Sequence, residues 1–433
     1  MSHWPSTENV AGFVRSINGD GEQRRISGCG QSMSRANGNL KLLIYGEYFL
    51  PVVGGVQTSM NLLAKGLVEL NSRHKRSDDQ GPIEVTVATR TAANGMDDSI
   101  FPYRVIRRPG FWRLINLIRG ADVVHVAGPC LLPMAIAWLI GKPFVVEHHG
   151  YQAICPNGLL FLEPSRTICP GYFGQRQYGK CVRCTSETVG LAGGVRFVLL
   201  TFPRRWLCKK VATNITITNH VAMRLGLPRS HTVYYGIDEQ DLVGADGVLA
   251  SSRPLGVAYV GRLVPEKGLP VLLQAAKCLK DNGVAFKLSF IGDGPERKEL
   301  EGLAQSLGMA DSVFFTGDLR GSELDRAVSK VAVVVMPSVW EETAGLSAIE
   351  QMMRGRVVIA ADIGGLSEVV GDAGLKFTPG DSRALASRVQ QVISQRDLLS
   401  SLGSSARVRA VQLFTIDSMI RNHLSTYREA MTR

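Results

Sequence analysis

Several features common in other classes of protein are missing from this sequence of 433 residues. The first 39 residues are polar and rich in Gly and Ser, with no apolar segment of the kind found in a secretory signal. The longest stretch without a formal charge, 123–141, contains His125, Gly128 and Pro129, which fits a buried strand and a core helix better than a membrane span. We therefore expect a disordered tail at 1–39 and a cytoplasmic protein.

The motifs of several enzyme and binding classes are also absent. The sequence has no nucleophile elbow of the hydrolase type and no H-E-x-x-H pair. No G-x-G-x-x-G follows the first strand of either half of the chain. No helix-turn-helix, RNP or zinc-finger pattern accompanies the net charge of +11, so nucleic acid is not an expected partner.

Two basic stretches, 104–120 and 195–210, are interleaved with bulky apolar residues. Such stretches are typical of a protein surface that lies on an anionic membrane. A basic rim around a cleft for an anionic substrate would have the same composition. We favour the membrane, and expect the protein to be peripheral at the inner face of the plasma membrane.

Strand and helix patterns alternate from Leu40 onward. Apolar, β-branched segments such as LKLLIYGEYFL and IEVTVATR are separated by stretches with helical periodicity. The alternation stops in a polar stretch, 235–254, and restarts with LGVAYVG, which predicts two Rossmann-like, doubly wound α/β domains facing a cleft. The expected divisions are an N-terminal domain at 40–247 with a Cys-rich insert at 151–190, a C-terminal domain at 248–414, and a final helix at 415–433 that packs back toward the first domain.

A pair of glutamates with seven residues between them, Glu342 and Glu350, is the most informative feature of the C-terminal half. A buried strand precedes the pair, so Glu342 is expected in a loop at the strand's carboxyl end and Glu350 on the helix that follows. The amides of Gly345 and Leu346 open that helix, where backbone N–H groups favour an anion. A diphosphate could bind there with one carboxylate on each side, although two glutamates at this spacing also occur without a function.

Other candidates follow predicted strands. Gly54 and Gly55 come after the first strand and would let backbone approach an anion closely, or form a simple turn. Arg262 and Lys267 follow the first strand of the second half, where two fixed cations suit a diphosphate leaving group or belong to a solvated loop. Gly317, after another strand, would leave room for a flat base.

The ordered set of motifs resembles that of the family 4 retaining glycosyltransferases, which have the GT-B fold. The resemblance covers residues 40–432 and is most specific from Val257 to Pro379. The segments that carry it are GGVQTSMNLLAKGL, DVVHVAG, EHHG, YYGID, VGRLVPEKG, FIGDGPE, FFTG, EETAGLSAIE and GGLSEVV.

The resemblance implies a role for individual residues. Glu350 resembles the glutamate that binds ribose, and Glu342 the one that contacts the hydroxyls of the donor sugar. Arg262 and Lys267 resemble the pair that holds the diphosphate, and His149 the histidine near the transferred sugar. Implied catalytic residues are His149, Arg262, Lys267 and Glu342. Implied donor-binding residues are Gly54, Gly55, Arg262, Lys267, Gly317, Ala344, Gly345, Leu346 and Glu350.

The family's chemistry is expected to come with this resemblance. The leaving phosphate activates the acceptor hydroxyl on the same face of the sugar, so no protein nucleophile and no catalytic metal are needed, and no D-x-D stands at a matching strand end. This chain departs from the common pattern at Ala344, where an aromatic residue is usual, and at Arg356, where proline is usual. The first difference bears on the shape of the sugar pocket.

Four of the eight cysteines lie in one stretch, at Cys155, Cys169, Cys181 and Cys184. Four clustered thiolates, one pair as C-x-x-C, suit a structural zinc site, with free thiols or an iron–sulfur cluster as alternatives. The stretch is similar to an insert found in a subset of family 4 enzymes. It interrupts the acceptor-side domain and is expected to shape the acceptor pocket or a membrane contact.

These observations favour a glycosyltransferase of cell-surface polysaccharide or glycolipid synthesis. Its expected partners are a nucleotide diphosphate sugar, a glycan or lipid-linked acceptor and an anionic membrane surface. The competing hypotheses are a Rossmann-type nucleotide-sugar oxidoreductase or epimerase, and a zinc-dependent binding protein without enzymatic activity.

Overall fold

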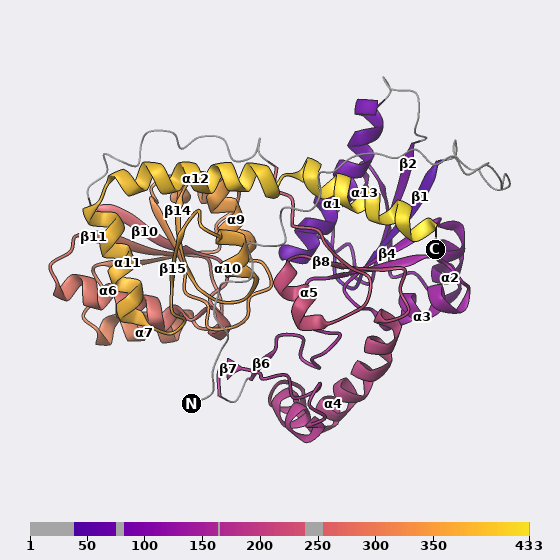
Figure 1. The fold of residues 1–433 in the computed structure, drawn as a ribbon, viewed down its shortest axis with the longest axis horizontal. Coiled ribbons are helices and arrows are strands. Elements are labelled where there is room, and N and C mark those ends of the chain that lie inside the picture. The colour runs from indigo at the N-terminus through magenta and orange to yellow at the C-terminus, as the bar shows by residue number, and fades with distance from the viewer. Residues whose placement is uncertain (1–38, 75–81, 163–164, 239–253, 433) are drawn as a thin grey trace, which may run out of the picture. The chain divides into compact units, whose positions relative to one another are not determined.

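The structure is a computed structural model that describes residues 39–74, 82–162, 165–238 and 254–432 (Figure 1). Nearly all of the tail predicted at 1–39, and most of the polar break predicted at 235–254, lie outside these residues. The described chain forms two parallel sheets and one short antiparallel hairpin.

The first sheet has seven strands in the order β3-β2-β1-β4-β5-β8-β9, and every neighbouring pair is parallel. Its central strands are buried along most of their length, because helices cover a parallel sheet on both faces. The strands are β1 (Leu40–Gly46), β2 (Ile83–Thr89), β3 (Arg104–Arg107), β4 (Val123–Ala127), β5 (Phe144–His148), β8 (Thr213–Thr216) and β9 (Ser230–Thr232).

Some of the connecting helices of this sheet begin at a side chain that caps the helix. Thr218 caps α5, for example, because its hydroxyl accepts a hydrogen bond from the Val221 amide at 3.3 Å. The helices are α1 (Gly55–His74), η1 (Asp98–Ile100), α2 (Phe111–Gly120), α3 (Leu131–Leu139), α4 (Tyr178–Cys208) and α5 (Asn219–Leu225).

The second sheet has six parallel strands in the order β12-β11-β10-β13-β14-β15. Its strands are β10 (Leu255–Val260), β11 (Phe286–Ile291), β12 (Val313–Gly317), β13 (Val333–Met336), β14 (Val357–Ala361) and β15 (Leu375–Phe377). Its helices are η3 (Pro265–Lys267), α6 (Leu269–Asp281), α7 (Arg297–Ser306), α8 (Gly321–Val328), α9 (Leu346–Met353), α10 (Gly364–Val370), α11 (Ser382–Ser394) and α12 (Asp397–Leu413). Both sheets are doubly wound, as the alternating pattern predicts.

The final helix, α13 (Ile416–Met431), packs on the first sheet although it follows the second one in the chain. Its apolar side chains Met419, Ile420 and Tyr427 are buried in the same core cluster as β1 and α1. Gly66 of α1 faces Ile420, where a Cβ atom would collide, so the small residue lets the two helices approach. The core of the first sheet is therefore completed by a distant segment.

The Cys-rich insert is more regular than the sequence suggests. Residues Phe161–Leu162 (β6) and Thr167–Ile168 (β7) form an antiparallel hairpin, and α4 begins at Tyr178. The second part of the insert is therefore helical, and Cys181 and Cys184 lie on α4. The backbone of Gly190 is not helical (φ 73°), so α4 consists of two helices joined by a kink.

None of the helices in the described part of the chain combines the length and the apolar composition needed to cross a bilayer.

Candidate active site

The loop between β13 and α9 places Glu342 among polar partners. One carboxylate oxygen, Oε2, accepts a hydrogen bond from the Ser338 hydroxyl at 2.6 Å. The other, Oε1, is ion-paired with the Lys267 ammonium at the end of η3. The Glu342 side chain is buried, so this pair holds the negative charge in a largely dry place. The structure therefore brings two predicted catalytic residues into direct contact.

Helix α9 begins immediately after this pair. Gly345 adopts a left-handed conformation (φ 85°), and a Cβ atom there would lie 2.8 Å from Leu366 Cδ1, which is too close. The amides of Leu346 and Ser347 start the helix and have no acceptor within it, whereas the Ala348 amide donates to the Gly345 carbonyl at 2.9 Å. The neighbouring Ala344 is buried. The start of α9, where sequence analysis predicted an anion site, therefore lies directly after Glu342 in the same loop.

Glu350 lies on α9, one turn beyond these amides. Its side chain is partly buried, and among the described residues no group donates a hydrogen bond to the carboxylate. Burial raises the pKa of Glu350 to about 7, an effect that the nearby Arg354 only partly opposes. The carboxylate retains its acceptor sites, as a ribose-binding group would need.

Two more predicted donor-binding residues of the second half, Arg262 and Gly317, lie where strands of its sheet end. Arg262 comes just after β10 and is exposed, and its backbone carbonyl accepts a hydrogen bond from the Tyr259 hydroxyl at 2.8 Å. Gly317 ends β12 with φ 76°, and a Cβ atom there would lie 3.3 Å from Arg297 Nη1. Both positions lie at the carboxyl edge of the sheet, the edge that also carries Glu342.

The glycines of the first half lie at the start of α1. A Cβ atom on Gly55 would lie 3.7 Å from Leu346 Cδ2, so the first residue of α1 is beside the first residue of α9. A Cβ atom on Gly54 would lie 2.6 Å from Gln57 Oε1. The structure therefore brings Gly55 next to the helix start that sequence reasoning assigned to the phosphates.

His149 follows β5 and is fixed by two partners that the sequence analysis did not identify. Its Nδ1 atom is 2.8 Å from the Tyr235 hydroxyl, and its Nε2 atom is 3.3 Å from Glu147 Oε2. Glu147 is itself buried and also lies 3.2 Å from His125 Nε2. Burial alone would raise the pKa of Glu147, but the neighbouring His149 and the hydrogen bond with His125 bring it well below its usual value.

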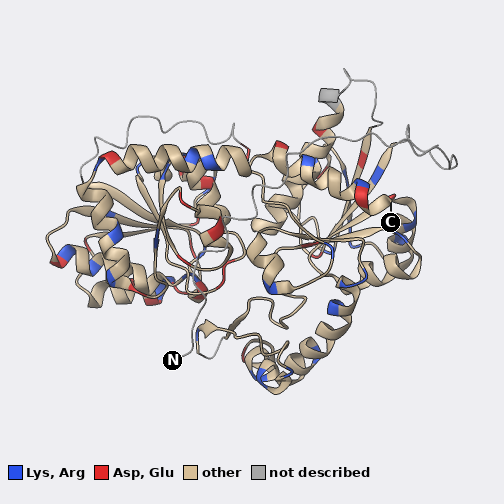
Figure 2. Cartoon of the chain, viewed as in Figure 1, with Lys and Arg blue, Asp and Glu red and all other residues tan. Residues whose placement is uncertain are grey.

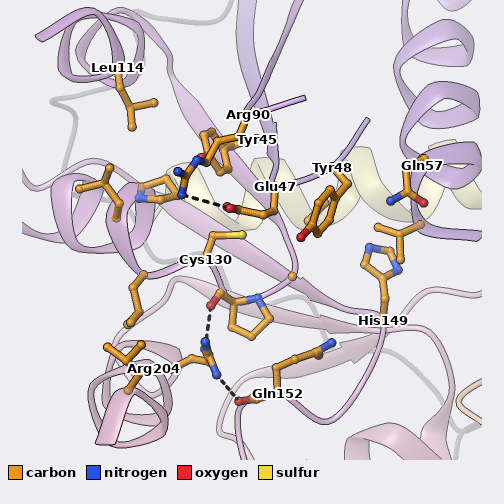
Figure 3. Close-up of a pocket in the computed structure, with 18 of the residues that line it drawn as sticks. Tyr45, Glu47, Tyr48, Gln57, Arg90, Leu114, Cys130, His149, Gln152 and Arg204 are labelled. Atoms are coloured by element: carbon orange, nitrogen blue, oxygen red, sulfur yellow. Dashed lines mark hydrogen bonds and ion pairs between the residues drawn. The ribbon is translucent and has the colours of Figure 1, made fainter. Parts of the chain in front are cut away.

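A cavity of about 1090 Å³ opens beside His149 at the carboxyl ends of β1, β2, β4 and β5 (Figure 3). Arg90 faces Glu47 there at 3.2 Å, and the Arg204 guanidinium points at the Gln152 backbone (Figure 3). All its lining residues belong to the first half of the chain, so Glu342 and the other donor residues of the second sheet do not line it. Its polar lining includes Glu47, Tyr48, Gln57, Arg90, Arg108, His149, Gln152, Arg196 and Arg204.

Sequence reasoning missed most of this cavity. It favoured a membrane surface for the basic stretches around Arg108, Arg196 and Arg204 and kept a basic rim around an anionic-substrate cleft as the alternative; these three side chains line the cavity. The sequence does indicate that these residues share a surface. Arg196, Leu200 and Arg204 are spaced four residues apart, which places them on one face of a helix. Glu147 could also have been noticed, because residues two apart on a strand lie on the same side as each other.

The four clustered cysteines are all buried, and no described cysteine forms a disulfide. Burial and the neighbouring thiols Cys155, Cys169 and Cys184 raise the pKa of Cys181 to about 12. Among the described residues, three metal-ligand atoms within 4.8 Å of one another occur only at His125, Glu147 and His423. The four cysteine side chains therefore lie near one another, but no three of their sulfur atoms are all within 4.8 Å of one another.

Comparison with known proteins gives a family match for part of the chain. Residues 248–409 match the family described as "Glycosyl transferases group 1". A 2-deoxystreptamine glucosyltransferase of Streptomyces kanamyceticus is 37% identical over 139 residues, which are 32% of this chain and 36% of that protein. The sulfoquinovosyl transferase SQD2 of Arabidopsis thaliana is 35% identical over 160 residues, covering 36% of this chain and 29% of that protein. The chain thus spans less than half the length of these relatives.

Solved structures match over nearly the whole chain. The Anabaena protein Alr3699/HepE superposes with a TM-score of 0.65 at 17% identity, covering 89% of this chain and 99% of that one. A sucrose-phosphate synthase from Thermosynechococcus elongatus has a TM-score of 0.65 at 18% identity, covering 91% and 100%. These neighbours confirm the predicted fold class, GT-B with two Rossmann-like domains.

Proposed function

We propose that this chain, which carries a group 1 glycosyltransferase domain at 248–409 on a GT-B fold, transfers a sugar from a nucleoside diphosphate to a glycan or lipid-linked acceptor with retention of configuration. The contact between Lys267 and Glu342 beside the open start of α9 carries this proposal. It joins a cation at the end of η3 to a carboxylate in the loop before α9 and to the backbone donors that start α9. The Anabaena neighbour was solved with UDP and with UDP-glucose, which supports a nucleotide sugar as donor.

The donor roles follow from the chemistry of each group. The diphosphate would lie on the amides at Leu346, because a helix start favours an anion. Arg262 and Lys267 would offset the charge that grows on the leaving phosphate. Glu350, whose carboxylate lacks a donor partner among the described residues, would accept hydrogen bonds from the ribose hydroxyls. Glu342 would bind the hydroxyls of the sugar.

The transfer step then requires no covalent enzyme intermediate. The bond between the anomeric carbon and the phosphate oxygen breaks, and the acceptor oxygen forms its bond on the same face. The acceptor proton passes to the leaving diphosphate oxygen. His149, whose Nδ1 is hydrogen-bonded to Tyr235, would contact the sugar or the acceptor near that face.

An anionic membrane surface remains part of this proposal. Helix α2 exposes Phe111 and Trp112, the latter with 76% of its surface accessible, and α4 exposes Leu199 and Trp206. Basic residues recur along the same helices (Figure 2). Apolar side chains interleaved with Lys and Arg suit the interface of a bilayer that contains anionic lipids. Co-sedimentation with phosphatidylglycerol vesicles but not with phosphatidylcholine vesicles would support this part of the proposal.

The decisive experiment measures donor turnover. Purified protein is screened with a panel of nucleotide sugars for thermal stabilisation and for release of the nucleoside diphosphate. Glu350→Gln should weaken binding of the bare nucleoside diphosphate in calorimetry, whereas Glu342→Gln should spare that binding and slow release. Stabilisation by no nucleotide, together with no release, would contradict the proposed function.

A further inference from the structure

The cavity beside His149 is rich in arginine. Arg196, Leu200 and Arg204 follow one another at intervals of four residues on α4, and all three line the cavity. Arg90 and Arg108 reach it from the carboxyl end of β2 and the segment after β3. A single glutamate, Glu47, is the only acidic residue in the lining. The cavity therefore carries an excess of positive charge.

Most of this charge has no acidic partner in the described chain. Arg90 is paired with Glu47 at 3.2 Å, but no described carboxylate lies within 4.0 Å of Arg108, Arg196 or Arg204. Arg204 instead donates to the backbone carbonyls of Pro129 at 3.2 Å and Gln152 at 3.3 Å. These two hydrogen bonds fix the direction of the guanidinium without neutralising it (Figure 3).

Two further observations indicate that the cations are held for a ligand. Burial lowers the pKa of Arg204, which means that its charge is poorly solvated where it stands. Arg108 has a left-handed backbone (φ 45°), although it precedes Pro109 and has a bulky side chain. Its Nε atom donates to the Arg90 carbonyl at 3.3 Å, which ties the two cavity arginines together. An anion in the cavity would offset these costs.

We propose that this cavity binds the acceptor, and that the acceptor carries a phosphate or diphosphate group held by Arg108, Arg196 and Arg204. The inference rests on the proposed function, because that function places sugar transfer near His149, which lines the same cavity. A phosphate is favoured over a single carboxylate, since its higher charge and several oxygens match more than one guanidinium fork. A cavity of about 1090 Å³ has room for a sugar phosphate.

The same chemistry occurs in two sources, a soluble sugar phosphate and the headgroup of a polyprenyl phosphate. Helix α4 exposes three bulky apolar side chains between and beyond its cavity arginines: Leu199, Phe202 and Trp206. Both sources are compatible with the arginines, so the experiment has one arm for each.

Binding is measured by calorimetry with the donor site saturated by the nucleoside diphosphate that stabilises the protein best. The probes are glucose 1-phosphate and the neutral methyl glucoside. We expect glucose 1-phosphate to bind, the neutral probe to fail, and added salt to weaken binding. In the second arm, phosphatidylcholine vesicles with and without a polyprenyl phosphate are compared by co-sedimentation. Stronger binding to the vesicles that contain it identifies the lipid as a source.

The critical variant is Arg196→Gln, because Arg196 is exposed and its loss leaves the core intact. We expect about a tenfold loss of affinity for the phosphorylated probe, the effect of one charge-assisted hydrogen bond. Arg205→Gln, on the same helix but outside the cavity, is the matched control and should bind as the wild type does.

Equal affinity for the charged and neutral probes, or an unchanged affinity in Arg196→Gln, would overturn the inference. An equal loss in Arg205→Gln would do the same, since it would reduce the effect to net charge. Release of the nucleoside diphosphate is measured in parallel. If release persists while the phosphorylated probe fails to bind, only the acceptor inference is wrong; if release is missing as well, the proposed function fails with it.

Discussion

Glu350 combines burial with a carboxylate that accepts no hydrogen bond within the described chain, and these two properties set its behaviour with pH. Burial raises its pKa in the folded protein to about 7, above its ordinary value of 4.5. Between these two values the folded state holds a proton that the unfolded state has lost. Stability therefore falls as pH rises through this window.

Replacing Glu350 with Gln should remove this penalty. We expect Glu350→Gln to be more stable than the wild type by roughly 1–3 kcal/mol at pH 8, and equally stable near pH 4.5. Urea unfolding at both pH values measures the difference. Glu323→Gln, at an exposed position on α8, should differ from the wild type by less than about 0.5 kcal/mol at either pH. A Glu350→Gln protein that shows no gain at pH 8 would contradict the assigned environment.

Lys267 is expected to exchange partners during the reaction. In the structure it neutralises Glu342, and in turnover it would offset the charge on the leaving diphosphate. Lys267→Ala should therefore raise the barrier by about 2–4 kcal/mol, which single-turnover kinetics measures. Lys277→Ala, at a partly exposed residue paired with Asp281, serves as the control. Turnover of Lys267→Ala within twofold of the wild type, with folding intact, would rule out this role.

At the scale of helices and strands, the sequence predicted the order of most elements. It did not predict which partners the charged side chains on these elements contact. Residues 104–107 belong to a basic stretch assigned to a membrane surface, yet they form β3. The Arg107 guanidinium lies 2.7 Å from Asp98 and donates to the Leu50 carbonyl at 2.8 Å. The composition of this stretch could not show that Arg107 is paired within the fold. Composition does not tell which side chain the guanidinium contacts, and the Leu50 carbonyl is far from Arg107 in sequence.

The start of α10 positions the loop that carries Glu342. Gly364 has φ 63°, and a Cβ atom there would lie 2.6 Å from the Glu342 carbonyl oxygen. Gly364→Ala should cost about 1–2 kcal/mol of stability for the backbone alone, and should also lower donor release more than tenfold by displacing the loop. Gly321→Ala, with φ 51° and open space around it, should lose stability but keep its turnover. Equal turnover in the two variants would show that the contact is unimportant.

The insert offers a second prediction at this scale. We propose that zinc draws the four buried thiols together, with Cys181 and Cys184 supplied by α4. Elemental analysis of protein purified without chelator should find close to one zinc per chain. Cys181→Ser should lose the metal, Cys278→Ser on α6 should keep it, and both should still bind nucleotide. Zinc far below one atom per chain, with no iron in its place, would leave free thiols as the explanation.

Across the whole molecule, long-range contacts decide what the sequence could not. The strand-end positions of Glu342, Lys267 and Gly345 were predictable, because motif spacing and strand pattern both mark them. The surroundings of His149 were predictable only in part. His423 and Tyr427, which lie on α13, contact the neighbouring residues Glu147 and His125. His423 Nε2 lies 3.6 Å from Glu147 Oε1 and has no hydrogen-bond partner there. Such a contact depends on the path of the entire chain.

The contacts of His423 and Tyr427 with Glu147 and His125 predict that α13 and the first sheet stabilise each other. Glu147→Gln should cost about 2–4 kcal/mol, because it removes a buried charge that faces three imidazoles. Glu84→Gln, exposed on β2, should cost less than about 0.5 kcal/mol. A double-mutant cycle of Glu147→Gln with His423→Gln, read by urea unfolding, should give a coupling of about 1 kcal/mol or more. Additive losses would indicate that α13 docks independently of Glu147.

The position of α13 also constrains how the protein is made. The helix that supplies Met419, Ile420 and Tyr427 to the first sheet is synthesised only after all six strands of the second. A ribosome therefore presents the first sheet to the cell with part of its apolar surface uncovered, while the second can complete its own core. Nascent chains that end before α13 should be clients of chaperones that bind exposed apolar surface.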